Sequence, residues 1–310
     1  MHLLPEPLYT LPTDNTLIQT IAGADNGRIF LGGKDGCLHE LVYQAEDGWF
    51  RRKCKKVNHS SSSLSFLVPS FLNFAFSEED PIVQIEIDNS RHVLYTRSDR
   101  GTIQVFDLGA DGKQMTKVIA VSQNSIVQQA VNIAKTIDRS NFRPVVHISA
   151  LDIVESVHIN LVAVTQSGVR FYFTATALIH PEARPFTLSL LHVRLPPGFS
   201  ANAPLQRPSH VHMAHYRKGC ALLASSQTED SDVMWAMSND SFPFQSQLME
   251  LHTVIPVDGK TWCMTEVLQF QPPKPLCTLN INNVILPSEP PLVVSQHAEL
   301  PRKFVVLSAQ

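Results

Sequence analysis

Apolar residues along the chain come mostly in short runs of four to seven that are rich in Val, Ile, Phe and Thr and end at turn residues. Runs of this length are typical of β-strands, whereas an amphipathic helix places its apolar residues three and four positions apart. The pattern therefore predicts a mainly β protein.

The runs pair into a recurring unit of an apolar strand, a polar turn usually closed by Gly, and a second apolar strand. The predicted hairpins are 29–31 with 37–43, 93–96 with 102–106, 161–164 with 169–173, and 221–224 with 233–237. A fifth begins at 304–307, and we expect that strand to lack its partner. Repeated hairpins without βα patterns predict an all-β fold, a partial β-propeller of about four to five blades from a longer propeller. A large β-sandwich is the alternative.

The hairpins are widely spaced. The turn glycines Gly36, Gly101 and Gly168 recur at intervals of 65 and 67 residues, whereas a compact blade takes roughly 40–50 residues. Each unit is therefore expected to carry an insertion. One insertion, 125–137, has apolar residues on a single helical face and predicts a short helix. Pro-rich stretches between 271 and 291 predict loops before the last strand.

Composition narrows the class of protein. The 310 residues are 44% hydrophobic and 17% charged, which predicts a globular chain. A net charge of −3 without a basic tract argues against nucleic-acid binding. The five cysteines stand singly, which predicts reduced thiols in an intracellular protein. The N-terminus does not read as a signal peptide, and no run of 18 apolar residues predicts a membrane-spanning helix.

The most unusual passage is the Ser-rich segment 57–77, which contains seven serines and no Asp, Glu, Lys or Arg. Placed on a helix, most of its large residues fall on one face and Ser65, Pro69, Ser70 and Asn73 fall opposite. An amphipathic segment with an uncharged polar face is typical of sensors of loose lipid packing. Its candidate membrane-binding residues are Leu64, Phe66, Leu67, Val68, Phe71, Leu72 and Phe74.

Other interpretations of this region stay open. The same phenylalanines fit core strands and the same serines fit a surface loop. Pro69 would also kink a continuous helix. The preceding basic run, Arg51 to Lys56, fits either a contact with anionic headgroups or a solvated strand end.

Few residues indicate chemistry. His210 and His212 lie on one face of a predicted strand, with His215 and Cys220 nearby, and two imidazoles in this arrangement fit Zn²⁺. No carboxylate or second cysteine stands at ligand spacing, so we interpret them as surface or partly buried strand histidines and predict no metal. Motifs of nucleophilic, metal-dependent and nucleotide-dependent enzymes are missing from the sequence, and we predict neither an enzyme nor a cofactor.

Four passages carry a resemblance to a known family. They are 33–40 (GKDGCLHE), 60–71 (SSSSLSFLVPSF), 88–98 (DNSRHVLYTRS) and 193–200 (VRLPPGFS). Together they resemble the large inner-ring scaffold nucleoporins of the nuclear pore complex, which combine an N-terminal β-propeller with a C-terminal α-solenoid. The resemblance extends over most of the chain and weakens between 252 and 299.

The resemblance implies that residues 1–310 are a portion of one N-terminal propeller without the solenoid. It also implies that the Ser-rich segment is the membrane-contacting loop of the family. The expected function is architectural, anchoring the inner ring to the curved pore membrane at the nuclear envelope and supporting transport of protein and mRNA. The expected partners are other inner-ring nucleoporins, linker and transmembrane nucleoporins, and the pore membrane. A soluble propeller adaptor and a propeller hydrolase remain as alternatives.

Overall fold

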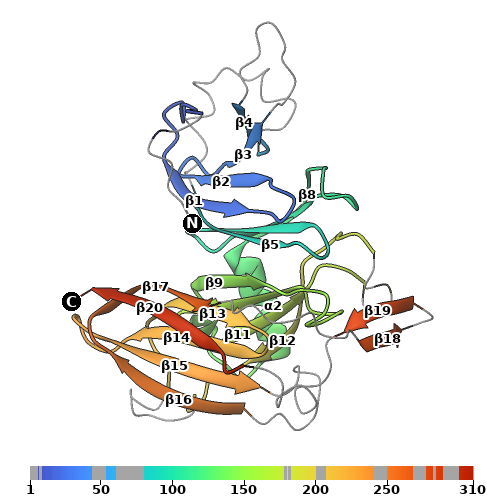
Figure 1. Ribbon diagram of the computed structural model, residues 1–310. Coiled ribbons are helices and arrows are strands. Elements are labelled where there is room, and N and C mark those ends of the chain that lie inside the picture. Colours follow the sequence, from blue (N-terminus) through green and yellow to red (C-terminus); the bar gives the residue numbers. More distant parts are fainter. Residues whose placement is uncertain are drawn as a thin grey trace, which may run out of the picture. The chain divides into compact units, whose positions relative to one another are not determined.

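The computed structural model describes residues 6, 9–43, 54–60, 80–177, 180, 183–199, 207–239, 250–267, 277–281, 284–288 and 300–309 (Figure 1). The chain divides into two compact units, 1–120 and 121–310. Four sheets share one plan, in which four strands are hydrogen-bonded in chain order. This meander is the usual construction of a propeller blade.

Unit 1 contains two of these sheets. The strands of the first sheet are β1 (Ile18–Gly23), β2 (Ile29–Gly33), β3 (Leu38–Tyr43) and β4 (Cys54–Asn58). The strands of the second are β5 (Ile82–Asp88), β6 (Val93–Ser98), β7 (Ile103–Asp107) and β8 (Thr116–Val121). The first strands of the two sheets, β1 and β5, lie against each other. Phe30, Leu38, Ile82, Leu94 and Phe106 belong to the core that joins the sheets.

Unit 2 repeats the plan. Its first sheet has β9 (Val145–Ala150), β10 (Leu161–Thr165), β11 (Arg170–Thr174) and β12 (Ser189–Arg194). Its second has β13 (Val211–Arg217), β14 (Cys220–Ser226), β15 (Asp232–Asn239) and β16 (Glu250–Val257). Figure 1 shows β14, β15 and β16 side by side. The first strands β9 and β13 again lie against each other, so the blade-to-blade packing of unit 1 recurs here.

The predicted fifth strand has a partner. β20 (Lys303–Ala309) pairs antiparallel with β17 (Lys260–Val267), which itself lies against β13. Between them, β18 (Cys277–Ile281) and β19 (Val284–Ser288) form a hairpin, so part of the stretch expected to be loop is strand. The prediction of an unpaired last strand is wrong, because β17 lies far from β20 in sequence and its apolar run is only three residues long.

Three blades share the same five-residue turn. In each, the fourth residue is glycine with positive φ: Gly36 (φ 74), Gly101 (φ 81) and Gly168 (φ 76). Its N–H donates to the carbonyl three residues earlier, of Gly33, Ser98 and Thr165 respectively, at 3.1, 3.0 and 2.8 Å. Only glycine adopts this backbone without steric cost. The sequence repeat is therefore a repeat of turn geometry.

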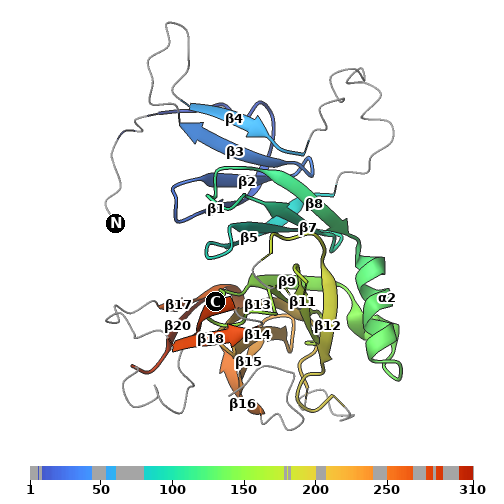
Figure 2. The same ribbon diagram turned by 90° about the vertical axis from the view of Figure 1, so that its right-hand side faces the viewer.

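The predicted helix is α2 (Gln123–Ile133), followed by a short 3-10 helix η2 (Arg139–Phe142). It begins two residues before the expected start because the Ser122 hydroxyl caps it, accepting from the Ser125 N–H. It ends at Ile133 because Ala134 leaves helical geometry. Its buried face packs beside β12, where Gln129 Oε1 accepts from the Leu190 N–H at 2.8 Å (Figure 2). Within the described ranges no helix is long and apolar enough to cross a membrane.

Candidate functional site

The seven candidate membrane-binding residues, Leu64, Phe66, Leu67, Val68, Phe71, Leu72 and Phe74, lie outside the described residues. What the structure describes is their attachment to unit 1. The chain leaves β4 through His59 and Ser60 and is described again from Asp80, which leads into β5. The candidate site is therefore built from these two attachment points and the elements that hold them.

Both attachment points are held at the β2–β3 turn. The Leu38 N–H donates to Ser60 Oγ at 2.8 Å, and the Leu38 carbonyl accepts from the His59 N–H at 2.8 Å. On the other side, a Cβ added to Gly36 would lie 3.0 Å from the Asp80 carbonyl oxygen. The Asp80 carboxylate also accepts from the Arg100 N–H at 3.0 Å. The segment between Ser60 and Asp80 thus starts and ends beside the same turn.

A buried ion-pair network lies next to the first attachment point. Glu40 accepts from Arg28 Nε at 2.7 Å and Arg28 Nη2 at 2.9 Å, and its Oε2 lies 2.7 Å from His59 Nε2. Burial alone would raise the pKa of Glu40, but the bonds from Arg28 and His59 lower it to about 2. Arg28 also donates to the carbonyls of Gly112 and Gln114, both at 2.8 Å. These bonds fix His59 to the rest of unit 1.

The basic residues before the Ser-rich segment differ in their surroundings. Lys56 is largely buried and donates to the Thr13 carbonyl and to Thr16 Oγ1, and its Nζ lies 3.5 Å from Asp14 Oδ2. Lys55 is exposed on β4, and Arg51 to Lys53 lie outside the described residues. Lys56 therefore holds the N-terminal stretch rather than standing free for a headgroup.

The histidines of 210–215 do not form a metal group with Cys220 in the described part of the chain. His212 Nε2 instead lies 2.8 Å from Asp232 Oδ2. His215 is half-buried, and its ring packs edge-on to Phe304 at 6.0 Å. His212 and His215 lie in β13, as interpreted, whereas His210 precedes the strand. The carboxylate that seemed missing is present, because the β14–β15 hairpin brings Asp232 to His212 across 20 residues of sequence.

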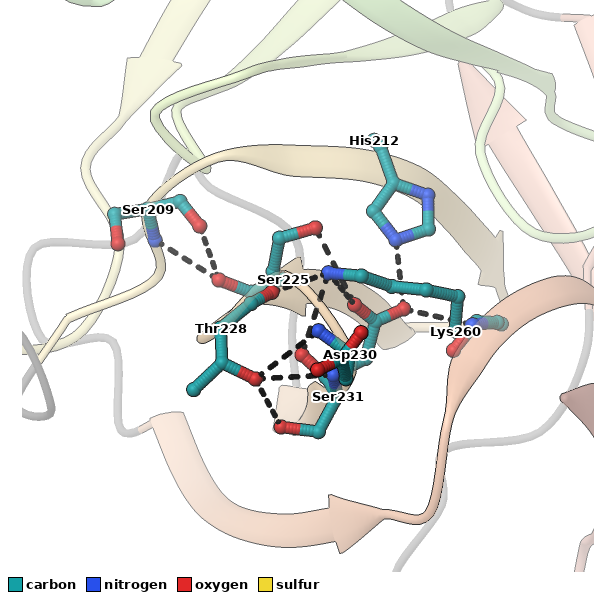
Figure 3. A network of polar contacts seen from close by, with 10 residues as sticks. Ser209, His212, Ser225, Thr228, Asp230, Ser231 and Lys260 are labelled. Carbon is teal, nitrogen blue, oxygen red and sulfur yellow. Dashed lines mark hydrogen bonds and ion pairs between the residues drawn. The ribbon is translucent and has the colours of Figure 1, made fainter. Parts of the chain in front are cut away.

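A polar network in unit 2 includes His212, Ser231 and Lys260 (Figure 3), and Asp232 bonds to two of these residues, His212 and Lys260. The Asp232 side chain is fully buried and accepts from the Thr261 N–H at 2.8 Å, Lys260 Nζ at 3.3 Å and Ser226 Oγ at 3.3 Å, besides His212. Burial raises its pKa, but the bonds from Thr261 and His212 hold the pKa below its ordinary value. One carboxylate thereby ties the start of β17 to β13 and β15.

A second buried charge pair joins β11 to β16. Arg170, whose side chain is 1% exposed, donates to both oxygens of Glu250 at 2.5 and 2.8 Å. Arg194 Nε lies 3.4 Å from Glu250 Oε2. Burial raises the pKa of Glu250, but its bonds to Arg170 lower it overall. The charged atoms of the pair bond to each other within the sheets of unit 2, so we assign the pair a structural role.

Turn carboxylates serve as caps, as their positions predict. Asp88 Oδ1 accepts from the N–H groups of Ser90 and Arg91 at 3.0 and 3.1 Å, and its other oxygen pairs with Arg91 Nη1 at 2.7 Å. Asp152 Oδ1 accepts from the Val154 N–H at 2.9 Å.

One mixed group of metal-ligand type does occur among the described residues. Asp35, Cys37 and His39 lie at the β2–β3 turn with one ligand atom each within 4.8 Å of the others.

Comparison with known proteins matches the whole chain to one family. The family model described as Nucleoporin_N, Nup133 N terminal like, matches residues 1–310. The chain is 38% identical over 309 residues to the nuclear pore complex protein Nup154 of Drosophila melanogaster, covering 90% of this chain and 23% of that protein. It is 31% identical over 193 residues to nucleoporin NUP170 of Chaetomium thermophilum, covering 58% of this chain and 13% of that protein. The chain thus spans about a quarter or less of the length of these relatives.

A solved structure shares the fold. The crystal structure of the Chaetomium thermophilum Nup170 NTD–Nup53 complex superposes with a TM-score of 0.71, at 22% identity, over 94% of this chain and 42% of that one. This likeness, with the repeated four-stranded sheets, confirms an all-β propeller portion with one short helical insertion in the described chain.

Proposed function

The chain belongs to the nucleoporin family with a Nup133-like N-terminal domain, and we propose that it anchors the inner-ring scaffold to the curved pore membrane through residues 57–77. Membership places it in the nuclear pore complex of the nuclear envelope, where its relatives are named as pore proteins. None of the names of these relatives denotes an enzyme, which agrees with a structural role.

The observation that supports membrane contact is the chemistry of the segment together with its attachment. The segment carries large apolar residues and no charge, so its adsorption would depend on apolar side chains entering packing defects and little on lipid charge. Its first residues lie in β4 and are held at Ser60, and Asp80, which follows its other end, is held by the Arg100 N–H. A segment held at both ends transmits force from the scaffold to the surface that it contacts.

Magnitudes indicate weak binding by a single copy. Each large apolar side chain contributes roughly 1.5–3 kcal/mol if fully buried. Ordering the backbone costs about 1–2 kcal/mol per residue, which offsets much of the gain from three or four such side chains. Several copies in one ring would raise the overall affinity through multivalency. We therefore propose that anchoring is collective.

Flotation with vesicles tests the proposal. Small and large vesicles of uncharged lipid are compared for the 310-residue chain and for a Phe66→Asp, Phe71→Asp double variant. The matched control is a Leu251→Asp, Trp262→Asp double variant, because these two side chains are 72% and 64% exposed elsewhere on the chain. We expect the unaltered chain and the control to float with small vesicles more than with large ones, and the segment variant to stay in solution.

Two results would contradict membrane anchoring. One is equal flotation of the segment variant and the unaltered chain. The other is no flotation of any folded chain at high vesicle concentration, which would favour the alternative, a soluble propeller adaptor that binds only proteins. Circular dichroism of each variant shows whether it is folded.

We also propose that this chain binds other nucleoporins, including inner-ring, linker and transmembrane components, and so supports transport of protein and mRNA through the pore. The support is that the structurally similar Nup170 domain was crystallised with Nup53. Calorimetric titration of the chain with a Nup53-type nucleoporin tests this directly. Saturable binding is expected, and heats no larger than dilution would contradict it.

A further inference from the structure

The β2–β3 turn brings a carboxylate, a thiol and an imidazole together. Asp35 lies in the turn, Cys37 follows Gly36, and His39 is the second residue of β3. Asp35 Oδ2 lies 3.2 Å from His39 Nε2, and all three ligand atoms lie within 4.8 Å of one another. These are the three donor types that zinc sites in proteins use.

The backbone holds this arrangement. Gly36, between Asp35 and Cys37, has φ 74 and leaves no room for a side chain because the Asp80 carbonyl is so close. Asp35 Oδ1 accepts from the Cys37 N–H at 3.0 Å, which orients the carboxylate. His39 is fixed in β3, opposite Leu31 and Asn58. The three groups are therefore positioned by the turn before any ligand binds.

The separation of the donors fits a metal ion. Two zinc bonds of about 2.0–2.1 Å at a tetrahedral angle place their donor atoms about 3.3 Å apart. The observed distance between Asp35 Oδ2 and His39 Nε2 is 3.2 Å. A thiolate bond of about 2.3 Å requires a slightly longer spacing. The Cys37 sulfur lies within 4.8 Å of the other two donor atoms, and Cys37 is only partly buried.

A purely structural interpretation explains Asp35 and the Cys37 thiol, whose Sγ donates to the Asp35 carbonyl at 3.8 Å, but it explains His39 less fully. The bond from the Cys37 N–H to Asp35 Oδ1 is an ordinary turn bond. His39, however, is 3% exposed, and its Nδ1 is a buried atom without a hydrogen-bond partner among the described residues. Only Asp35 holds this ring by a side-chain bond. A metal ion between the two side chains would replace this single bond with coordination by His39 Nε2 and Asp35 Oδ2, the atoms that lie 3.2 Å apart.

We propose that Asp35, Cys37 and His39 bind one zinc ion, with water as the fourth ligand. Zinc fits best because the donor set mixes sulfur, nitrogen and oxygen, whereas calcium and magnesium require oxygen ligands. The ion would brace the turn on which both attachment points of the Ser-rich segment rest.

The test measures metal binding by the 310-residue chain. Zinc content after dialysis gives the stoichiometry, and Co²⁺ replaces zinc as a spectroscopic probe, since a thiolate ligand adds a charge-transfer absorption. The variants are Cys37→Ser, His39→Gln and Asp35→Asn. The last keeps an oxygen that accepts the Cys37 N–H. Cys54→Ser is the matched control, because Cys54 is a partly buried cysteine on β4 outside the group.

We expect one zinc per chain, and a cobalt charge-transfer band that Cys37→Ser abolishes and Cys54→Ser keeps. Loss of a residue that merely orients a ligand weakens metal affinity about 10–100-fold, so losing Cys37 or His39 should weaken it by at least about 100-fold. Thermal melts in chelator show whether each variant folds without metal. Stoichiometric zinc that survives Cys37→Ser, or no zinc on the unaltered chain, would overturn the proposal. Neither result depends on vesicle binding.

Discussion

The buried pair of Arg170 and Glu250 predicts an asymmetric response to substitution. Glu250→Gln leaves the Arg170 guanidinium, 1% exposed, without a counter-charge. Breaking a buried ion pair in this way costs about 3–5 kcal/mol. Arg170→Met leaves Glu250 with Arg194 at 3.4 Å, so a second cation partly compensates, and we expect a loss of about 1–3 kcal/mol.

The double variant completes the cycle. Replacing both members of a buried pair by neutral groups is often close to neutral, because no buried charge is left unpaired. We therefore expect Arg170→Met, Glu250→Gln to be no less stable than Glu250→Gln alone, and far more stable than the sum of the single changes predicts.

Urea unfolding at neutral pH, followed by tryptophan fluorescence, measures these differences. Trp235 is buried in the same unit and reports on it. If Arg170→Met destabilises as much as Glu250→Gln, or if the two changes add, the assignment of Arg194 as the compensating cation is wrong.

Three further predictions concern the two units separately. Asp232→Ala should lower the free energy of unfolding by about 3–5 kcal/mol and Asp232→Asn by only about 1–2, because Asn still accepts from the Thr261 N–H; urea titration of both checks the order. Gly36→Ala should destabilise by about 1–3 kcal/mol, and more than Gly27→Ala, since both have positive φ but only Gly36 has backbone within 4 Å of an added Cβ; equal losses in thermal unfolding would contradict the close contact. The pKa of Glu40 is lowered from 4.5 to about 2, so its contribution of roughly 3 kcal/mol is complete above pH 4.5 and is lost as the pH falls toward 2; Glu40→Gln should flatten the stability profile over that range.

The hairpins could be predicted because their signal is local. Gly36, Gly101 and Gly168 close the same turn in three blades, and the strands on either side, such as β10 and β11, are buried along their length. Burial on both faces produces continuous apolar runs that stand out in the sequence. The helix could also be predicted from a local signal, the single apolar face that it buries.

The outer strands could not be predicted in this way. β16 is largely exposed, and β4 and β8 contain no buried residue and one buried residue respectively, so little requires an apolar pattern in them. β17 was also missed, because its apolar run is only three residues long, 262–264, before Thr265 and Glu266 interrupt it. Its place depends on hydrogen bonds to β20 and to Asp232, which are far from it in sequence.

The candidate sites could also be predicted only in part from the sequence. Composition alone singled out the Ser-rich segment, but the attachment of Ser60 to Leu38 depends on tertiary contacts. In the sequence, the histidine spacing that indicates a metal is at His210 and His212. The group of Asp35, Cys37 and His39 was not predicted, because the turn geometry that brings the three side chains together is not visible in their spacing.

Amide hydrogen exchange resolved by peptide, with and without small vesicles of uncharged lipid, tests the central claim most directly. If residues 57–77 contact the pore membrane, vesicles should slow exchange in peptides from this segment and leave those from β9 to β12 unchanged. Exchange that vesicles do not alter, or that is already slow in this segment without them, would show that the segment belongs to the protein core or to another partner and contradict the account.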